Sequence, residues 1–346
     1  MIYTEWDKLT EMIVGQVYDP NTFHKASDNI EWMRDSEFRD GMFQVLEETN
    51  SDLNKLQKLL ESFGVKVHRP KNLPLKYEST RMWETIIPYP GICPRDMHVV
   101  YDDKIISTIG GDPNRYTESN FFSQIMLSHT ERNYISMPQP LLDSQYKPYK
   151  ELEGQILYHA ANILKCGELL VHTKPYAPGV HGRGTYAGLQ WLKNQIPDVD
   201  WAEIPACGHA DGKMALITPG LLLVKQLELI PEQLKDWDCI KMSPKPLPDW
   251  FNKVMDQKYY KERVTEWLGH WIGHVEETPF DINIISVDEK TVICNGYDKE
   301  VEDHMKKHGV EMIPFHFKHK HFWDSGLHCV TLDITREGNN GLYHSR

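Results

Sequence analysis

The chain contains three short segments in which groups capable of covalent or acid–base chemistry stand next to a predicted strand. In GHADG, His209 and Asp211 are two residues apart, so an extended chain places both side chains on one face. In SGLHC, Cys329 directly follows a histidine. A cysteine at a strand end and a histidine elsewhere are the minimum for nucleophilic chemistry by a thiolate. The three segments are CPRD at residues 93–96, GHADG at 208–212 and SGLHC at 325–329.

Each segment taken alone has a simpler explanation. A Cys-Pro-Arg-Asp sequence is typical of a turn with a surface ion pair, and a His-Cys pair is typical of a cysteine packed in the core. The glycine-rich residues 178–184 could suggest a phosphate loop, but no Gly-Lys-Ser/Thr follows them, so we interpret them as a surface or active-site loop. Arg183 in this loop and Arg115 are candidates for binding a carboxylate.

The elements that must position these groups form a repeated pattern. Residues 50–63 have helical spacing, end at Gly64 and lead into a strand, and residues 300–313 read as a polar helix, Gly309 and a strand. The order strand, strand, helix, strand predicts an α/β or α+β domain of repeated units, and no linker divides residues 1–346. Apolar segments predict buried strands at residues 11–15, 98–101, 105–106, 168–171, 215–224, 282–287, 291–294 and 328–334. Several of them are expected to pair through tight turns such as YDDK and TPG.

Composition limits the partners of the 346 residues. The 38 Lys and Arg against 50 Asp and Glu give a net charge of −12 without a basic cluster, so we expect no nucleic-acid partner. The six cysteines contain no CxxC pair, which fits a reducing compartment better than a disulfide framework. The longest apolar stretch, residues 214–224, is interrupted by Thr, Pro and Gly, and the N-terminal segment is acidic. We therefore expect a soluble cytoplasmic protein without a membrane partner.

Together and in this order, the motifs resemble those of the amidinotransferases, a family of guanidino-group-modifying enzymes that includes glycine amidinotransferase and inosamine-phosphate amidinotransferase. The resemblance extends from TEWDKLTEMIVG, through CPRDMHVVYDDKIIS, NRYTES, HAANILKCG and GHADGKMALITPGLLL, to SGLHCVTLDITREG. It implies a pseudo-fivefold α/β-propeller of ββαβ units, with the active site at the central channel.

The resemblance also implies roles for particular residues. A guanidinium group is a planar cation, so carboxylates in its plane can orient it while a thiolate attacks its central carbon. By resemblance, Asp96 and Asp211 are these carboxylates and Cys329 is the nucleophile. His209 would protonate the departing amine and then deprotonate the incoming one. No metal ion or organic cofactor is implied. Further candidates for substrate binding are Arg95, Arg115, Asn162 and His328.

Two positions depart from the family pattern. In YHAAN, residues 158–162, His159 stands where relatives have a carboxylate that orients the catalytic histidine. A histidine can hold the ring of His209 by a hydrogen bond, but it does not stabilise an imidazolium as a carboxylate does. Relatives that use arginine carry an arginine after the PGLLL strand, whereas this chain has KQLE at residues 225–228. Lys225 is a candidate substitute for that arginine.

The resemblance predicts transfer of an amidino group from an arginine-like donor to a primary amine, through a covalent intermediate on Cys329. Two alternatives stay open. One is a hydrolase of the same superfamily, in which water resolves the same intermediate. The other is a non-catalytic protein that binds guanidino compounds, a hypothesis motivated by His159. The expected partners are a small guanidino donor and an amine acceptor, with a homodimer as one assembly to consider.

Overall fold

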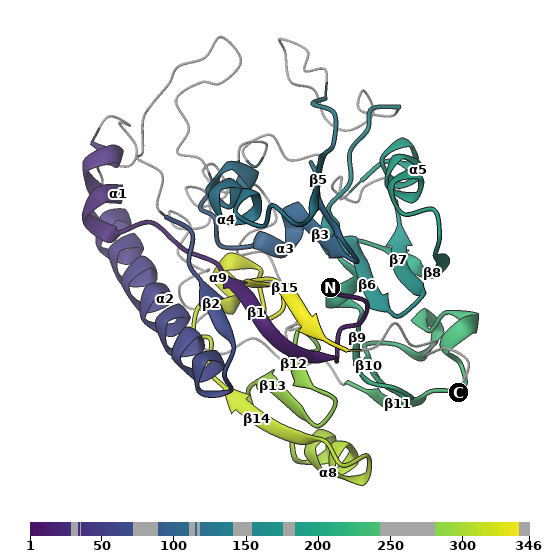
Figure 1. Cartoon of the computed structure of the whole chain (residues 1–346). Helices are drawn as coiled ribbons and strands as arrows, with labels where there is room; N and C mark the ends of the chain where they lie inside the picture. The colour runs from purple at the N-terminus through teal and green to yellow at the C-terminus, as the bar shows by residue number, and fades with distance from the viewer. Residues whose placement is uncertain are drawn as a thin grey trace.

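The strands of the protein form five similar sheets (Figure 1). The computed structural model describes residues 1–28, 34, 36–71, 89–110, 115, 118–140, 154–175, 184–242 and 281–338. In this part of the chain, each sheet has three strands. The first strand runs antiparallel to the middle strand, and the middle strand runs parallel to the third. This constant order confirms the repeated unit that the sequence pattern predicts.

We number the units 1 to 5 in the chain order of their middle strands. Unit 1 contains β15 (Thr331–Glu337), β1 (Lys8–Val14) and β2 (Lys66–His68). Unit 2 contains β3 (His98–Tyr101), β4 (Lys104–Ser107) and β5 (Asn133–Ser136). Unit 3 contains β6 (Ile163–Cys166), β7 (Leu169–Lys174) and β8 (Asp200–Cys207). Unit 4 contains β9 (Met214–Thr218), β10 (Leu221–Val224) and β11 (Asp238–Lys241), and unit 5 contains β12 (Ile285–Asp288), β13 (Thr291–Asn295) and β14 (Glu311–Phe315).

Two kinds of connection build the units. In units 2 to 5, tight turns join the antiparallel neighbours, and three of these turns use a residue with positive φ: Asp102 (52°), Gly167 (70°) and Gly220 (83°). A parallel neighbour requires a longer crossover, which usually contains a helix. The crossovers contain α2 (Ser36–Ser62), α4 (Ser123–Leu127), α5 (Tyr186–Gln195) and α8 (Lys299–Lys307), and in unit 4 η7 (Leu227–Leu229) and η8 (Glu232–Leu234).

Local capping fixes the ends of several helices. The Thr185 hydroxyl accepts the Gly188 N–H at the start of α5, and the Asp298 carboxylate accepts two N–H groups at the start of α8. Gly64 and Gly309 follow α2 and α8 with positive φ, as the sequence predicts. None of the described helices is both long and apolar enough to cross a bilayer. The remaining helices are α1 (Pro20–Ser27), α3 (Pro94–Met97), α9 (Lys320–Trp323), η3 (Glu118–Phe121), η5 (Ala160–Asn162) and η6 (Ala210–Gly212).

The structure corrects several predicted boundaries. The helix predicted at residues 50–63 is the C-terminal part of α2, which begins at Ser36. The tight turn predicted at TPG, by contrast, is confirmed, because residues 215–224 belong to two strands, β9 and β10, that pair through Gly220. The strands β6 and β8 were not predicted, because β6 contains a lysine and β8 alternates polar with apolar side chains.

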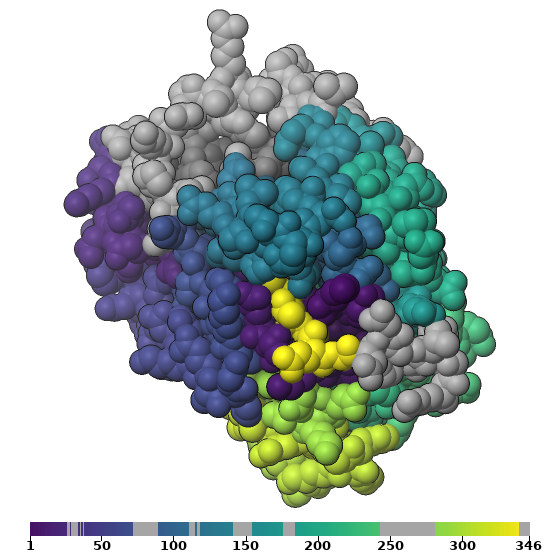
Figure 2. Space-filling view, in the orientation of Figure 1, coloured from purple at the N-terminus to yellow at the C-terminus, as the bar shows by residue number. Residues whose placement is uncertain are grey.

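The five units form a closed ring. Around the ring, β15 contacts β3, β3 contacts η5 directly before β6, β6 contacts β9, and β9 contacts β12. β12 then contacts β1, which belongs to the same unit as β15. The ring closes inside unit 1, where β1 and β15 pair antiparallel from Val14 with Thr331 to Lys8 with Glu337. In Figure 2, the yellow C-terminal strand lies between purple N-terminal residues. The expected pseudo-fivefold α/β-propeller is therefore confirmed.

Apolar side chains fill the space between the sheets and their crossovers. All five residues of β9 and all four of β10 are buried. In unit 5, Val301 and Met305 of α8 belong to one buried cluster with Val292 of β13. Burial of such side chains is worth about 1.5–3 kcal/mol each, so packing holds the strand ends in fixed positions.

Charged side chains occupy the centre of the ring. Asp333 of β15 is fully buried and accepts hydrogen bonds or ion pairs from Arg95 of α3, from Lys165 of β6 (Nζ to Oδ2, 3.1 Å) and from Arg336 (Nε to Oδ2, 3.0 Å). Glu5 is also buried, with its Oε1 3.2 Å from Lys165 Nζ. We call Glu5, Arg95, Lys165, Asp333 and Arg336 the central ion cluster. It joins three units, because its members come from units 1, 2 and 3 and from the N-terminal segment.

We expect Lys165→Met to lower the free energy of unfolding by about 3–5 kcal/mol, because it leaves two buried carboxylates with one cation fewer. Lys8→Met is the matched control. Lys8 forms an ion pair between β1 and β15 with Glu337, both side chains are 63% exposed, and its removal should cost less than about 1 kcal/mol. Urea unfolding of both variants measures the difference, and equal effects would contradict a stabilising role for the cluster.

The same variant should change the pH dependence of stability. Burial raises the pKa values of Glu5 and Asp333, but the charges of Lys165 on Glu5 and of Arg95 and Lys165 on Asp333 lower both below their unfolded values of 4.5 and 3.8. The stability from these groups is therefore present above the unfolded values and is lost as the pH falls below them. Wild-type stability should decrease as the pH falls below about 5, with a shallower slope in Lys165→Met.

Candidate active site

The segments that precede the first strands of the units bring polar side chains together. α3 contacts η5, and η5 contacts η6. Side chains on η6, on residues 281–284 before β12 and on residues 326–330 before β15 are hydrogen bonded to one another. The five segments carry, in chain order, Asp96, His159 with Asn162, His209 with Asp211, Asn283 and Cys329. The structure thus brings the three sequence motifs to one place.

Cys329 is 5% exposed and is held by two neighbours. Its N–H donates to Asn283 Oδ1 at 3.0 Å, and Asn283 Nδ2 donates to its Sγ at 3.2 Å. The thiol donates to Asp211 Oδ2 at 3.3 Å. A Cβ at Gly326 would lie 2.4 Å from the Asn283 Cβ, so glycine permits this close approach. Backbone and side chain of the cysteine are therefore fixed by one amide.

The electrostatics keep Cys329 protonated at rest. Burial and the negative charges of Asp211 and Asp96 raise the pKa of the Cys329 thiol well above its ordinary value. Burial alone would raise the pKa of Asp211, but a hydrogen bond from His328 outweighs this effect and lowers it. Asp211 is therefore ionised. Because the thiolate is the reactive form, Cys329 needs a nearby positive charge before it can act as a nucleophile.

His209 lies between an imidazole and a carboxylate. Its Nε2 is 2.9 Å from His159 Nδ1, and its Nδ1 is 3.8 Å from Asp96 Oδ1. His159 is fully buried, and a Cβ at Gly110 would lie 1.5 Å from its Nε2, so only glycine leaves room for this ring. The two imidazoles meet as expected, with a histidine in the place of the family's carboxylate.

Arg115 binds carboxylates of the protein itself. Its Nη1 donates to Asp96 Oδ2 at 2.8 Å, its Nε donates to Glu118 Oε2 at 2.6 Å, and its guanidinium lies 4.6 Å from the centre of the Tyr89 ring. Burial raises the pKa of Glu118 to about 8, against the opposing effect of Arg115. The guanidinium of Arg115 therefore holds Asp96 in position. Contact between Arg115 and a substrate stays a prediction.

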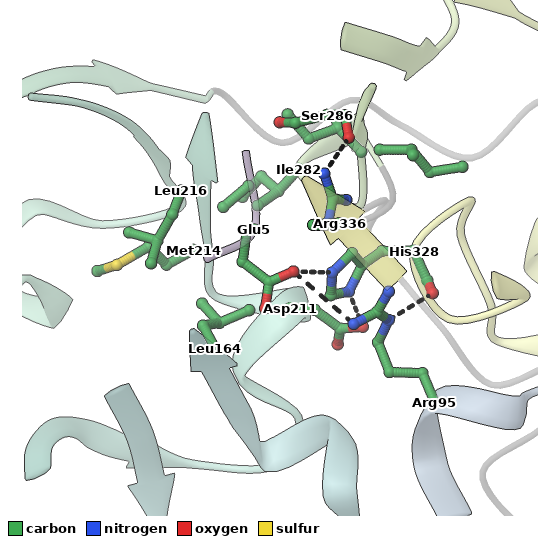
Figure 3. Close-up of a pocket in the computed structure, with 13 residues that line it drawn as sticks. Glu5, Arg95, Leu164, Asp211, Met214, Leu216, Ile282, Ser286, His328 and Arg336 are labelled. Atoms are coloured by element: carbon green, nitrogen blue, oxygen red, sulfur yellow. Dashed lines mark hydrogen bonds and ion pairs between the residues drawn. The ribbon is translucent and has the colours of Figure 1, made fainter. Parts of the chain in front are cut away.

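Arg95 and His328 also bind within the protein (Figure 3). Arg95 Nε donates to the His328 carbonyl at 2.9 Å, and its Nη2 binds Asp333. The ring nitrogens of His328 lie 2.9 Å from Asp211 Oδ2 and 3.2 Å from Glu5 Oε2. These two residues connect the central ion cluster to Asp211, and their contact with a substrate stays a prediction.

The other predicted residues have different outcomes. Asn162 is buried at the end of η5 and hydrogen bonds with the Tyr158 side chain. Lys225 is half-buried directly after β10, and its N–H donates to the Lys213 carbonyl, which places it at the η6 end of unit 4. Arg183, in the glycine-rich loop, lies outside the described residues.

Asn283 was missed by the sequence analysis. The predicted strand at residues 282–287 included it, whereas β12 begins at Ile285. Asn283 stands two residues before the first strand of its unit, as Asp96 stands before β3 and Cys329 before β15. This equal spacing is the signal that could have identified it. Glu118 carried no comparable signal, because its role depends on the position of Arg115.

Full-length relatives of the chain are known by sequence, although no family model matches it. The chain is 25% identical to inosamine-phosphate amidinotransferase 1 of Streptomyces griseus, with 97% of this chain and 96% of the relative covered. It is 26% identical to the L-arginine:L-lysine amidinotransferase of Pseudomonas savastanoi pv. phaseolicola, with coverage of 99% and 95%.

A solved structure has the same fold. The inosamine-phosphate amidinotransferase StrB1 from Streptomyces griseus matches with a TM-score of 0.74 and 23% identity, over 99% of this chain and 98% of that one. The similarity includes every segment that carries a motif, because it spans both chains almost completely. The chain belongs to the amidinotransferase family, has the same fold as this solved structure, and is an enzyme of that family.

Proposed function

We propose that the protein transfers an amidino group from an arginine-like guanidino donor to a primary amine, with Cys329 as the covalent carrier. One observation carries this proposal. Among the described residues, Asp96 Oδ1 and Asp211 Oδ1 are buried and have no hydrogen-bond partner. The second oxygen of each is bound, that of Asp96 by Arg115 and that of Asp211 by His328. A guanidinium has N–H donors for both unpartnered oxygens and a positive charge that two carboxylates favour.

Binding of the donor also activates the nucleophile. The charges of Asp211 and Asp96 hold the Cys329 proton in place, and a guanidinium between them offsets both charges. The thiol then gives its proton to His209, and the thiolate attacks the central guanidino carbon. The bond from that carbon to the donor amine breaks as His209 passes the proton to the amine. The product is an amidino group on sulfur and a neutral amine.

The second half-reaction is the reverse with a different amine. The acceptor nitrogen attacks the amidino carbon, His209 takes its proton, and the carbon–sulfur bond breaks. The amide of Asn283, whose Nδ2 is 3.2 Å from Sγ, donates a hydrogen bond to the departing thiolate. His159 keeps the ring of His209 oriented through the contact between Nδ1 and Nε2 at 2.9 Å.

Arginine and lysine are the first substrates to test. The name of one relative states that it acts between L-arginine and L-lysine. Lys225, beside η6, is our candidate for binding the α-carboxylate of the donor, in place of the arginine that relatives carry there. Acceptor identity depends on parts of the site that the motifs do not specify.

Transfer is tested with arginine labelled in the guanidino carbon, incubated with and without a panel of glycine, lysine and ornithine. We expect label in a new guanidino compound only when an amine is present, and an enzyme mass increased by one amidino group when it is absent. A steady release of urea with ornithine, or of citrulline with ammonia, at a rate independent of added amine would identify a hydrolase instead. Arginine binding without either product or adduct would identify a non-catalytic binding protein.

Cys329→Ala should reduce turnover by at least about three orders of magnitude and abolish the mass increase, because only this side chain forms the covalent bond. Binding of arginine, measured by calorimetry, should persist because both aspartates remain. Cys294→Ala is the control, since Cys294 is buried in β13 of unit 5. The assignment is wrong if the Cys329 variant still accumulates amidino-enzyme.

His159→Asp should change the pH dependence of the second half-reaction. A carboxylate 3 Å or so from His209 raises the pKa of its imidazolium, by roughly 1–3 units for a close opposite charge. Since His209 must be neutral to take a proton, the acidic limb of the pH–rate profile should move to higher pH. His159→Asn introduces a side chain of the size of aspartate without its charge, and it should leave the acidic limb of the profile in place. Identical profiles for both variants would remove His159 from the catalytic network.

A further inference from the structure

Three side chains with metal-binding atoms meet between units 1 and 2, and amidino transfer uses none of them. Glu11 lies on β1, His68 ends β2, and His129 follows α4 (Figure 1). His68 Nε2 is 2.7 Å and His129 Nε2 is 3.4 Å from Glu11 Oε1. The side chains are 22%, 10% and 14% exposed for His68, His129 and Glu11. We propose that these three residues form a binding site for a divalent transition-metal ion of the zinc class.

The orientation of His129 points to a cation. Its Nδ1 lies 2.9 Å from the Ile125 carbonyl, which can only accept, so Nδ1 carries a hydrogen. The other ring nitrogen, Nε2, faces Glu11 Oε1 at 3.4 Å, beyond the usual length of a hydrogen bond. A metal ion between the two atoms would bind the imidazole nitrogen and the carboxylate oxygen at the same time. A histidine whose second nitrogen donates to a backbone carbonyl is the usual arrangement at metal sites.

Glu11 is oriented in the same way. Its Oε2 accepts from the Thr335 hydroxyl at 3.3 Å, which leaves Oε1 directed toward the two imidazoles. Although burial raises it, hydrogen bonds from Lys66 and His68 lower the pKa of Glu11 to about 2, so the carboxylate is ionised. Lys66 Nζ now lies 2.7 Å from Oε1, but the side chain is 69% exposed and can turn into solvent when a metal ion binds.

The spacing suits a small tetrahedral ion. Bonds of about 2.0–2.2 Å from zinc to nitrogen and oxygen place neighbouring ligand atoms about 3.3 Å apart. The separation between His129 and Glu11 already has this value, whereas His68 must withdraw by about 0.6 Å and carry its hydrogen on Nδ1. Two imidazoles and one carboxylate favour zinc and its neighbours over magnesium or calcium. Water would occupy the fourth position.

A second group of three residues provides a contrast. The Nε2 atoms of His304 and His308, on α8 and just after it, lie 2.8 and 2.7 Å from Asp238 Oδ2. Both imidazoles lie within hydrogen-bond distance of that oxygen, and each can donate an N–H to it. The Asp238 carboxylate is 47% exposed. This group is satisfied without an ion and serves as a control for surface chelation.

The test uses the full chain freed of metal, titrated with zinc against a chromophoric chelator and with cobalt observed by visible absorption. We expect one equivalent bound with nitrogen and oxygen ligation, without a thiolate charge-transfer band, and a higher Tm with zinc. Glu11→Gln and His129→Ala should each weaken binding at least about tenfold. Lys66→Met should strengthen binding, because it removes a competing cation and leaves the ligands intact. A gain in affinity cannot come from misfolding.

Two controls separate this site from others. The double variant His304→Ala/His308→Ala removes the surface group, and His209→Ala removes the candidate active-site group of Asp96, His159 and His209. Both should retain the zinc affinity of the wild type. The proposal is overturned if the wild type binds no zinc, if binding disappears only in a control variant, or if Lys66→Met and His129→Ala both leave the affinity unchanged.

Discussion

The burial of an ionised Asp333 at the centre of the ring is the constraint on which the rest of the structure depends. A buried carboxylate without compensation costs several kcal/mol, and its cations come from units 2 and 3 and from its own strand. Arg95 and Lys165, which belong to units 2 and 3, reach it only when the ring is closed. Arg95 extends the same cluster to the His328 carbonyl, and His328 binds Asp211 beside Cys329. The buried charges that hold the closed ring together therefore also position the residues of the candidate site.

The repeated fold explains how side chains of different chemistry from all five units meet. Each unit enters its first strand through a short segment near the ring axis, so any polar residue at that entry faces the same region. Units 2 and 4 contribute the carboxylates Asp96 and Asp211, unit 5 contributes the amide of Asn283, and unit 1 contributes the thiol of Cys329. The backbone is nearly symmetric, while the chemistry is divided among the units. A substitution at one entry, such as His159, can thus alter the reaction without altering the scaffold.

Sequence reasoning identified the groups that carry recognisable chemistry and missed those that act through other residues. The positions of Asp96, Asp211 and Cys329 followed from short motifs, and the repeat followed from the alternation of strands and helices. The carboxylate partners of Arg95, Arg115 and His328 within the protein could not be predicted, because a sequence shows a charge but not its partner. Asn283 was hidden in an apolar run, since a strand boundary cannot be located to within two residues by pattern alone.

The pairing of β1 with β15 has a consequence for how the enzyme is made. Val14 and Thr331 come together from distant parts of the chain, and contacts of such long range form late and slowly. Cys329 immediately precedes β15, and its hydrogen bonds to Asn283 and Asp211 join three units. Until the last strand docks, the thiol therefore has neither the burial nor the charges that suppress its reactivity. The step that completes the propeller therefore also buries Cys329 and places it beside the carboxylate that keeps its thiol protonated.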